Sequence, residues 1–400
     1  MAPKDRRSLL LIPTLPAVTT PAGGVVLTRK FIAGCEAFRA SWDGPLDLLL
    51  RPTREPTDNL DNVEVRPGDL AFGLRVLPLD DPAVKPLLAA AGVVLGGLCH
   101  EQSHLAAWSA EVGTPFAYTT EYTLRTRLQI ASVEVKNPLR RLRRMWFERG
   151  LERRHEVSLR QASGLQCNGT PTFDAYRGLT PDALLFFDTR LEQAHLIGAG
   201  MLDERLRERQ RRQAAGEPIR LAFSGRLKEM KGVDHLLPVA EELRRLGVPF
   251  QLDIFGDGNL NQALDEGIED RSLAGLVRRH GTLDFHTELT PRIQSQCDLF
   301  VACHRQGDPS CTYLETFGCG VPIAGYANEA FAGLLERTES GVSVPMDQPE
   351  GLARAIQALA ADTERLARLS HTARAFAAEN TCERTFAARA DHLERLRRRA

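Results

Sequence analysis

The sequence predicts an α/β protein made of two Rossmann-like domains, each built on a parallel sheet. Three observations lead to this prediction. The chain has 400 residues, which is long for one hydrophobic core and suitable for two of similar size. Short apolar runs alternate with stretches of helical periodicity in both halves, as expected for buried strands covered by helices. A highly charged segment separates the halves.

This charged segment sets the expected domain boundaries. Eight of the ten residues from 203 to 212 are charged, so no buried face is expected there and residues 201–217 are predicted to be a linker. Residues 1–200 then form an N-terminal domain and residues 218–381 a C-terminal domain. A final helix is predicted for residues 382–400, because its basic end complements the dipole at a helix C-terminus.

Charge and cysteine content narrow the class of protein. The 51 basic residues balance 52 acidic ones and 43% of the residues are hydrophobic. We therefore expect a globular protein with no overall attraction to nucleic acid or membrane. The eight cysteines include no Cys-x-x-Cys pair, so they are interpreted as reduced thiols of a cytoplasmic protein.

The first residues are similar to a secretory signal in one respect. Lys4, Arg6 and Arg7 precede the apolar run 9–12. The run is short and Pro13 follows it, which favours a first buried strand over a signal. No stretch approaches the ~20 apolar residues of a transmembrane helix, so no membrane span is expected.

In the first half, short apolar runs bounded by proline, glycine or aspartate predict strands. They lie at residues 8–13, 46–50, 70–76, 93–95, 115–119, 164–168 and 184–187. Apolar residues with helical spacing predict helices at 25–38 and 103–112. Gly23 and Gly24 precede the first of these helices, where they either let the backbone approach a ligand or form a plain turn.

Polar clusters follow two strands of the first half. His100 lies between Cys99 and Glu101 after one strand, and Glu121 lies in the cluster 119–123 after another. Ligands of parallel sheets bind at the carboxyl ends of the strands. His100 and Glu121 are therefore candidate catalytic residues, with a purely structural role as the alternative for His100.

The second half repeats the strand pattern at residues 219–224, 252–255, 299–302, 323–326 and 341–344. Gly225 follows the first of these strands and relieves crowding at its end. Arg226 and Lys231 lie on the loop that follows, and both can reach one anion from opposite sides. Arginine and lysine are the usual side chains for phosphate recognition.

The segment 298–325 has the pattern strand, loop, helix, strand. A Gly-Asp-Pro-Ser loop interrupts the chain before a helix that begins near Thr312. Free amides around Ser310, Cys311 and Thr312, together with the helix dipole, favour a bound phosphate. Glu315 follows within about one turn, where its carboxylate can accept hydrogen bonds from hydroxyl groups of the same ligand.

Several of these motifs occur together in one known family. They are Gly-Arg-x4-Lys-Gly at 225–232, Gly-Asp-Gly at 256–258, His-Gly at 280–281 and YLETFGCGVP at 313–322, in the family's order. The chain resembles the retaining GT-B glycosyltransferases of family 4, also called group 1. This resemblance implies two Rossmann-like domains whose parallel sheets face each other across a cleft, with the final helix joined to the first domain.

The resemblance also implies roles for residues of the donor site. Glu315 would contact the ribose of a nucleotide-sugar, and His280 would lie near the nucleotide base. The family has a further glutamate eight residues before Glu315, where this chain has Gly307. Asp308 is the predicted replacement in the contact to the donor sugar.

On the acceptor side, the resemblance implies that the loop with Gly23 and Gly24 faces the donor or the acceptor. Glu121 stands where the family commonly has a histidine. The acceptor is predicted to be a carbohydrate, a lipid-linked molecule or another small molecule, and it would bind mainly to the first domain.

The predicted function is that of a hexosyltransferase that moves a sugar from a nucleoside diphosphate donor to an acceptor with retention of configuration. No Asp-x-Asp lies where it would suit a metal, so we expect Arg226, Lys231 and helix amides to neutralise the leaving group without a metal or cofactor. The alternatives are a nucleotide-sugar epimerase, a phosphorylase, or a nucleotide-sugar-binding protein without turnover.

A basic segment runs from residue 136 to residue 160. It carries nine Lys and Arg residues, and Trp146 and Phe147 lie among them. A basic amphipathic helix of this kind can lie on anionic lipid, which would place the protein at a membrane surface. The alternative is a solvated helix face with Arg-Glu pairs at helical spacing.

Overall fold

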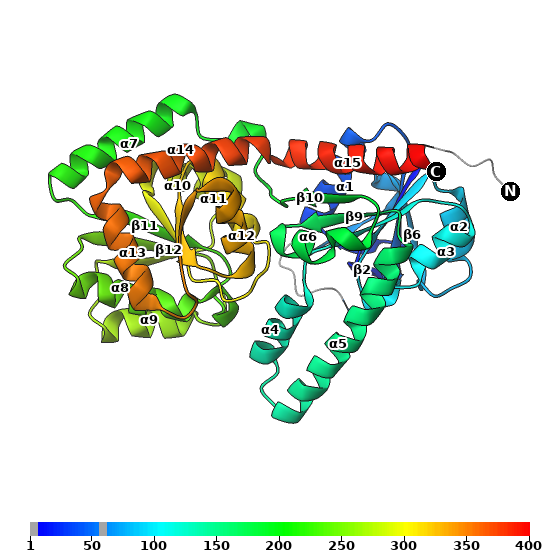
Figure 1. Ribbon diagram of the computed structural model, residues 1–400, viewed down its shortest axis with the longest axis horizontal. Coiled ribbons are helices and arrows are strands. Elements are labelled where there is room, and N and C mark those ends of the chain that lie inside the picture. The colour runs from blue at the N-terminus through cyan, green and yellow to red at the C-terminus, as the bar shows by residue number, and fades with distance from the viewer. Residues whose placement is uncertain (1–6, 56–61) are drawn as a thin grey trace. The chain divides into compact units, whose positions relative to one another are not determined.

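The computed structural model describes residues 7–55 and 62–400 (Figure 1). The chain divides into two compact units. Unit 1 comprises Met1–Leu124, Asn137–Phe186 and Glu383–Ala400, and unit 2 comprises Arg125–Lys136 and Phe187–Cys382. Lys4 and Arg6 of the signal-like start lie outside the described residues.

Unit 1 is built on a ten-stranded sheet with the order β10, β9, β8, β7, β1, β4, β2, β3, β5, and with β6 paired to β4. All neighbours are parallel except β3, which is antiparallel to β2 and β5. The bounds are β1 Leu9–Ile12, β2 Pro16–Thr19, β3 Val25–Thr28, β4 Leu46–Pro52, β5 Asn62–Val65, β6 Gly73–Val76, β7 Val93–Gly97, β8 Phe116–Thr120, β9 Gly164–Asn168 and β10 Ala183–Phe186.

The longer helices of unit 1 are α1 Arg29–Ser41, α2 Val84–Ala90, α3 Leu105–Glu111, α5 Pro138–Gln161, α6 Thr170–Tyr176 and α15 Cys382–Arg399. Helices α2, α3 and α5 pack against the parallel strands and form a hydrophobic core with them. In this core, Leu88, Leu105 and Leu159 of the helices pack with Val94 and Leu165 of the strands. Helix α15 belongs to unit 1 from Glu383 onward.

The β2–β3 hairpin includes residues 25–28, which the sequence predicts to be the start of a helix. The helix predicted from residue 25 begins at Arg29, because Val25–Thr28 form strand β3 and pair with β2 and β5. Thr28 caps the helix, since its hydroxyl accepts a hydrogen bond from the Phe31 amide at 3.1 Å. The prediction failed because the apolar run 25–28 fits a half-buried strand as well as a helix.

Unit 2 is built on a six-stranded sheet with the order β13, β12, β11, β14, β15, β16. Every neighbouring pair is parallel. Apolar strand residues such as Phe223, Ile254 and Val301 pack with Leu236 and Ile356 from helices. The bounds are β11 Ile219–Ser224, β12 Phe250–Phe255, β13 Val277–Gly281, β14 Leu299–Ala302, β15 Ile323–Tyr326 and β16 Gly341–Val344.

Helices surround this second sheet (Figure 1). They are α7 Ala199–Ala214, α8 Leu236–Arg245, α9 Asn261–Asp270, α10 Thr290–Gln296, α11 Cys311–Gly318, α12 Glu329–Thr338, α13 Pro349–Ala361 and α14 Thr363–Glu379. A further helix, α4, spans Leu124–Glu134. Helix α4 belongs to unit 2 from Arg125 onward. In the described part of the chain, no helix combines the length and the apolar character that a membrane span needs.

The segment predicted to be the linker 201–217 is mostly helix α7, and it has a buried face. Leu202, Arg205, Arg209 and Arg212 are all buried, at the spacing of one helix face. Arg205 donates hydrogen bonds to the carbonyls of Gln294 and Cys319, at 2.8 and 2.9 Å. The prediction failed because it equated charge with exposure, whereas arginine can enter a core when its donors are satisfied.

Asp298 completes this buried face. Its carboxylate accepts a hydrogen bond from Arg212 at 2.6 Å and one from the Arg220 amide at 2.8 Å. Arg209 lies 3.8 Å from the same carboxylate. Burial lowers the pKa of Arg209, and the Asp298 carboxylate opposes that shift. A carboxylate at the start of β14 therefore anchors helix α7 to the second sheet.

Candidate functional site

The second sheet has a topological switch point between its central strands. From β11 the chain passes outward through β12 to β13, and it then returns to β14 on the other side of β11. Because all six strands are parallel, their carboxyl ends lie at one edge of the sheet, and ligands of such sheets bind outside the switch point. The loops that follow β11 and β14 are therefore the expected place for a ligand.

Lys231 and Asp308 bring these two loops together. Lys231 Nζ lies 3.1 Å from Asp308 Oδ2, and the side chains are 12% and 14% exposed. Gly232 makes this approach possible, because it has a φ of 65° and a Cβ there would collide with the backbone of Cys303. Arg226 is exposed on the first loop. Lys231 and Asp308 meet as an ion pair, which the sequence did not predict.

Helix α11 begins beside this pair. Ser310 is its N-cap residue, and the Ser310 amide donates to the carbonyl of Asp308 at 2.9 Å. The Cys311 thiol donates to Asp188 at 3.3 Å. The first amides of a helix have no acceptor within it and carry the positive end of its dipole. The amides of Cys311 and Thr312 are thus suited to an anion, whereas the Ser310 amide of the prediction is already bound to the Asp308 carbonyl.

Glu315 is buried, with 8% of its surface exposed. Arg190 holds its carboxylate with two hydrogen bonds, from Nε to Oε1 at 2.9 Å and from Nη2 to Oε2 at 3.3 Å. The guanidinium of Arg190 also lies over the ring of Phe285, 4.2 Å from its centre. A carboxylate has about four acceptor positions, so Glu315 can accept further hydrogen bonds from a ligand.

His280 lies at the carboxyl end of β13 and is held on both sides. Its Nε2 is 2.5 Å from Asp253 Oδ1, and its ring stacks on Phe255 with 4.9 Å between the centres. The Gly256 amide donates to the carbonyl of Gly281 at 2.7 Å. These contacts fix the ring at the same sheet edge as Lys231 and helix α11.

A buried polar network supports the loop after β14. His304 Nδ1 lies 3.1 Å from the hydroxyl of Tyr313, and Asn328 donates to the same hydroxyl at 3.0 Å. Burial lowers the pKa of His304 well below its usual range, and the Lys231 charge adds to the shift. The imidazole is therefore neutral. No sequence pattern indicates this network, because its residues belong to three separate segments.

The candidate residues of unit 1 do not form one cluster. Gly23 and Gly24 lie in the turn of the β2–β3 hairpin, where the Thr20 amide donates to the carbonyl of Gly24 at 2.8 Å. His100 follows β7, and its Nε2 accepts a hydrogen bond from Arg154 of α5 at 3.0 Å. Strands β1, β4 and β2 separate β7 from β3 in the sheet. Glu121 is exposed directly after β8.

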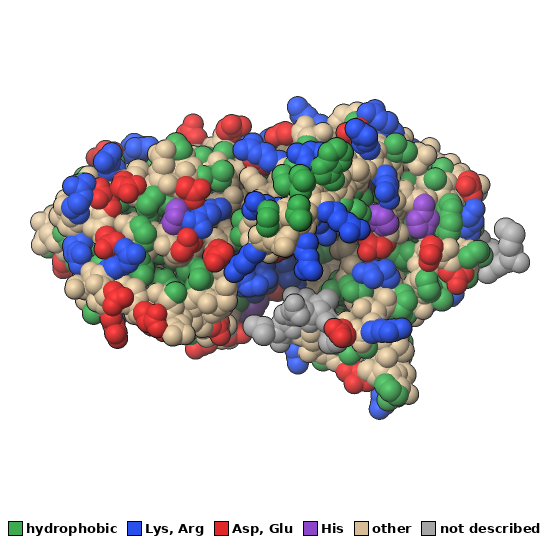
Figure 2. All heavy atoms as spheres, turned by 90° about the horizontal axis from the view of Figure 1, so that it is seen from below, with side chains coloured by type: hydrophobic (Ala, Val, Ile, Leu, Met, Phe, Trp, Pro, Cys, Tyr) green, Lys and Arg blue, Asp and Glu red, His purple; other side chains and the backbone are tan. Residues whose placement is uncertain are grey.

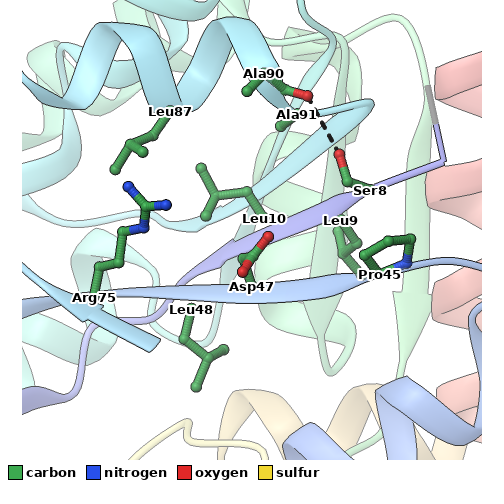
Figure 3. A pocket seen from close by; sticks show the side chains of 10 residues that line it. All are labelled: Ser8, Leu9, Leu10, Pro45, Asp47, Leu48, Arg75, Leu87, Ala90 and Ala91. Carbon is green, nitrogen blue, oxygen red and sulfur yellow. Dashed lines mark hydrogen bonds between the residues drawn. The ribbon is translucent and has the colours of Figure 1, made fainter. Parts of the chain in front are cut away.

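Unit 1 also contains a cavity of about 250 Å³, close to Ser8, Leu10, Asp47, Arg75 and Leu87 (Figure 3). It lies at the amino ends of β1 and β4, opposite the edge where ligands of parallel sheets bind. Its volume is also below the ~300 to 1,000 Å³ of typical ligand pockets. We assign no ligand to this cavity.

Comparison with known proteins finds a family model that covers most of unit 2. Residues 204–376 match the family model described as "Glycosyl transferases group 1". They form a group 1 glycosyltransferase domain. The group 1 domain contains both loops at the switch point and helix α11.

Two curated relatives are similar to part of this chain. An alpha-D-kanosaminyltransferase of Streptomyces kanamyceticus is 28% identical over 195 residues, which are 49% of this chain and 47% of the relative. A D-inositol 3-phosphate glycosyltransferase of Stackebrandtia nassauensis is 28% identical over 210 residues, 48% of this chain and 46% of the relative. The chain therefore spans about half the length of the curated relatives that it matches.

Solved structures are similar over nearly the whole chain. HepE of Anabaena in complex with UDP has a TM-score of 0.63 and 15% identity, covering 97% of this chain and 100% of that one. Sucrose-phosphate synthase of Thermosynechococcus elongatus has a TM-score of 0.61 and 15% identity, covering 97% and 98%. These similarities confirm the predicted α/β fold class of GT-B glycosyltransferases, while the predicted cleft between the domains stays a prediction.

Proposed function

We propose that the protein transfers a sugar from a nucleoside diphosphate donor to a hydroxyl acceptor. The observation that carries this proposal is the convergence of three features at one switch point of the group 1 domain. Lys231 and the first amides of α11 supply positive charge and donors for a diphosphate, and Glu315 supplies acceptors for hydroxyls. The solved neighbours in complex with UDP and with UDP-glucose support a nucleotide-sugar as donor.

The proposed chemistry depends on how the leaving diphosphate is stabilised. Negative charge develops on this group as the bond to the sugar breaks, and preorganised donors stabilise it. We assign this role to Lys231, to Arg226 and to the amides of Cys311 and Thr312, with no metal or cofactor required. Retention of configuration is part of the proposal and rests on the resemblance to retaining glycosyltransferases. On the acceptor side, Glu121 and His100 stay candidates, as do Gly23 and Gly24.

The test is release of nucleoside diphosphate from nucleotide-sugars in the presence and absence of hydroxyl acceptors. We expect release to depend on an acceptor, to persist in chelator, and to give a product with the anomeric configuration of the donor by NMR. Conversion of the nucleotide-sugar without any acceptor would favour an epimerase. A reaction that requires inorganic phosphate would favour a phosphorylase. If chelator abolishes transfer and magnesium restores it, the metal-independent mechanism is wrong.

Replacing Glu315 with alanine is expected to weaken nucleotide-sugar binding by about tenfold or more. Hydrogen bonds from ribose hydroxyls to a carboxylate contribute roughly 1.5 to 3 kcal/mol each, and the buried Glu315 retains acceptor positions beside Arg190. Titration calorimetry with the variant and the unmodified protein measures the loss. Equal dissociation constants would rule out Glu315 as the ribose contact.

We also propose that the first half of helix α5 contacts anionic lipid. Leu139, Leu142 and Trp146 are 78%, 55% and 70% exposed, and their spacing puts them on one face of the helix. The four arginines Arg140, Arg141, Arg143 and Arg144 lie between them. Figure 2 looks from below onto this part of the molecule and shows hydrophobic and basic side chains next to each other. An exposed apolar stripe with basic neighbours complements an anionic bilayer surface.

Replacing Trp146 with glutamate is expected to reduce binding to anionic vesicles by about tenfold or more, because a buried aromatic side chain contributes roughly 1.5 to 3 kcal/mol. Co-sedimentation with phosphatidylcholine vesicles, with and without phosphatidylglycerol, measures the binding. Val157→Glu is the matched control, since Val157 is exposed on the second half of α5. If the unmodified protein does not sediment with the anionic vesicles, the proposal is contradicted.

A further inference from the structure

Gly307 lies where several side chains converge on the loop after β14. Its amide donates to Gln129 Oε1 at 3.2 Å, and its carbonyl accepts from Thr126 Oγ1 at 3.4 Å. A Cβ on Gly307 would lie 3.0 Å from Glu329 Oε2 and 3.3 Å from Thr126 Oγ1. The space that a side chain at this position would enter is therefore lined by the carboxylate of Glu329.

Glu329 is held in this place by its neighbours. Arg125 Nη1 lies 2.7 Å from Glu329 Oε1. Glu329 is the first residue of helix α12, and the preceding Asn328 is buried and donates to the carbonyl of His304 at 3.1 Å. One carboxylate oxygen is thus paired, and the helix start is fixed to the loop that carries Gly307.

The other oxygen is a buried acceptor without a donor. Among the described residues, Glu329 Oε2, Asp308 Oδ1 and Gln306 Oε1 are buried and have no hydrogen-bond partner. Gln306 is 7% exposed. Leaving a buried polar atom unpaired is unfavourable, so these acceptors indicate a ligand that brings donors. A group with several hydroxyls satisfies acceptors of this kind, whereas a phosphate brings only further acceptors.

From this geometry we infer that Glu329 binds the sugar of the donor through its hydroxyl groups, with Asp308 as its neighbour in the same contact. The inference rests on the proposed function and divides the site into two parts. Lys231 and the α11 amides take the diphosphate, while the acceptors around Gly307 take the sugar. Glu329 lies outside every motif recognised in the sequence, and it occupies the space left by the missing side chain at Gly307.

The test compares nucleotide-sugars with nucleoside diphosphates that lack the sugar. Titration calorimetry with UDP, UDP-glucose, GDP and GDP-mannose is measured for the unmodified protein, for Glu329→Gln and for Glu329→Ala. We expect both variants to bind the nucleotide-sugar at least tenfold more weakly and the matching nucleoside diphosphate within twofold of the unmodified protein. Glu336→Ala is the matched control, because Glu336 is exposed on the same helix.

The alternative is that Glu329 acts only as an acidic residue in the first turn of α12, where its negative charge interacts favourably with the positive end of the helix dipole. In that case the variants would lower the thermal midpoint and leave the difference between nucleotide-sugar and nucleoside diphosphate unchanged, which would overturn the inference. Equal weakening of both ligands would also overturn it. If the unmodified protein binds none of the four probes, the proposed function itself is contradicted, and the inference with it.

Discussion

Replacing Asp298 with alanine is expected to lower the free energy of unfolding of the group 1 domain by about 3 to 5 kcal/mol, the usual cost of removing one partner from a buried ion pair. Asp298 is 2% exposed, and its partners Arg209 and Arg212 are 3% and 5% exposed. Without the carboxylate, two guanidinium groups stay buried with no counter-charge. Urea unfolding followed by circular dichroism measures the change.

Glu208→Ala is the control for this variant. Glu208 lies on the outer face of α7 and pairs with Arg211 at 3.1 Å, and both side chains are exposed. Exposed ion pairs contribute about 0 to 1 kcal/mol, so the free energy of unfolding of this variant should be close to that of the unmodified protein. If the free energy of unfolding of Asp298→Ala also lies within about 1 kcal/mol of that of the unmodified protein, the buried face of α7 does not depend on this carboxylate.

Replacing Lys231 with alanine is expected to lower turnover by about 100-fold or more, with a smaller effect on the dissociation constant of the donor. A preorganised donor is worth about 2.7 to 4 kcal/mol when charge develops in the transition state. Lys231 is largely buried and paired with Asp308, so the loops keep its position before the donor binds. Steady-state kinetics and calorimetry on the same preparations separate the two effects.

Lys228→Ala is the matched control, because Lys228 is exposed on the same loop. It should keep normal turnover. A Lys231→Ala variant with unchanged turnover, or one whose whole loss is in donor affinity, would contradict the assigned role.

The sequence was sufficient to predict most of the parallel strands of both sheets, but not β2, β3 and β5 of unit 1. Strands such as 164–168, 219–224, 299–302 and 341–344 agree with the structure, because buried parallel strands are short apolar runs between chain breakers. The start of helix α11 is also close to its predicted place. These features depend on local patterns, and local patterns are visible in a single sequence.

Other features depend on contacts between distant segments, and the sequence did not reveal them. Arg190 lies 125 residues from Glu315, and nothing around Arg190 marks it as a partner of a carboxylate. The buried face of α7 had a signal in the helical spacing of Leu202, Arg205, Arg209 and Arg212, but high charge concealed it. His100 contacts Arg154 of α5, a pairing that no local pattern indicates.

A crystal structure of the complex with a nucleoside diphosphate shows whether this ligand binds at the switch point of the second sheet. The nucleotide is the one that gives the largest thermal shift, since a ligand that binds the folded state raises stability. We expect diphosphate oxygens within hydrogen-bond distance of Lys231 Nζ and the amides of Cys311 and Thr312, with ribose hydroxyls bound to Glu315. A diphosphate bound in the cavity beside Asp47 and Arg75, or anywhere else away from Lys231, would contradict this expectation.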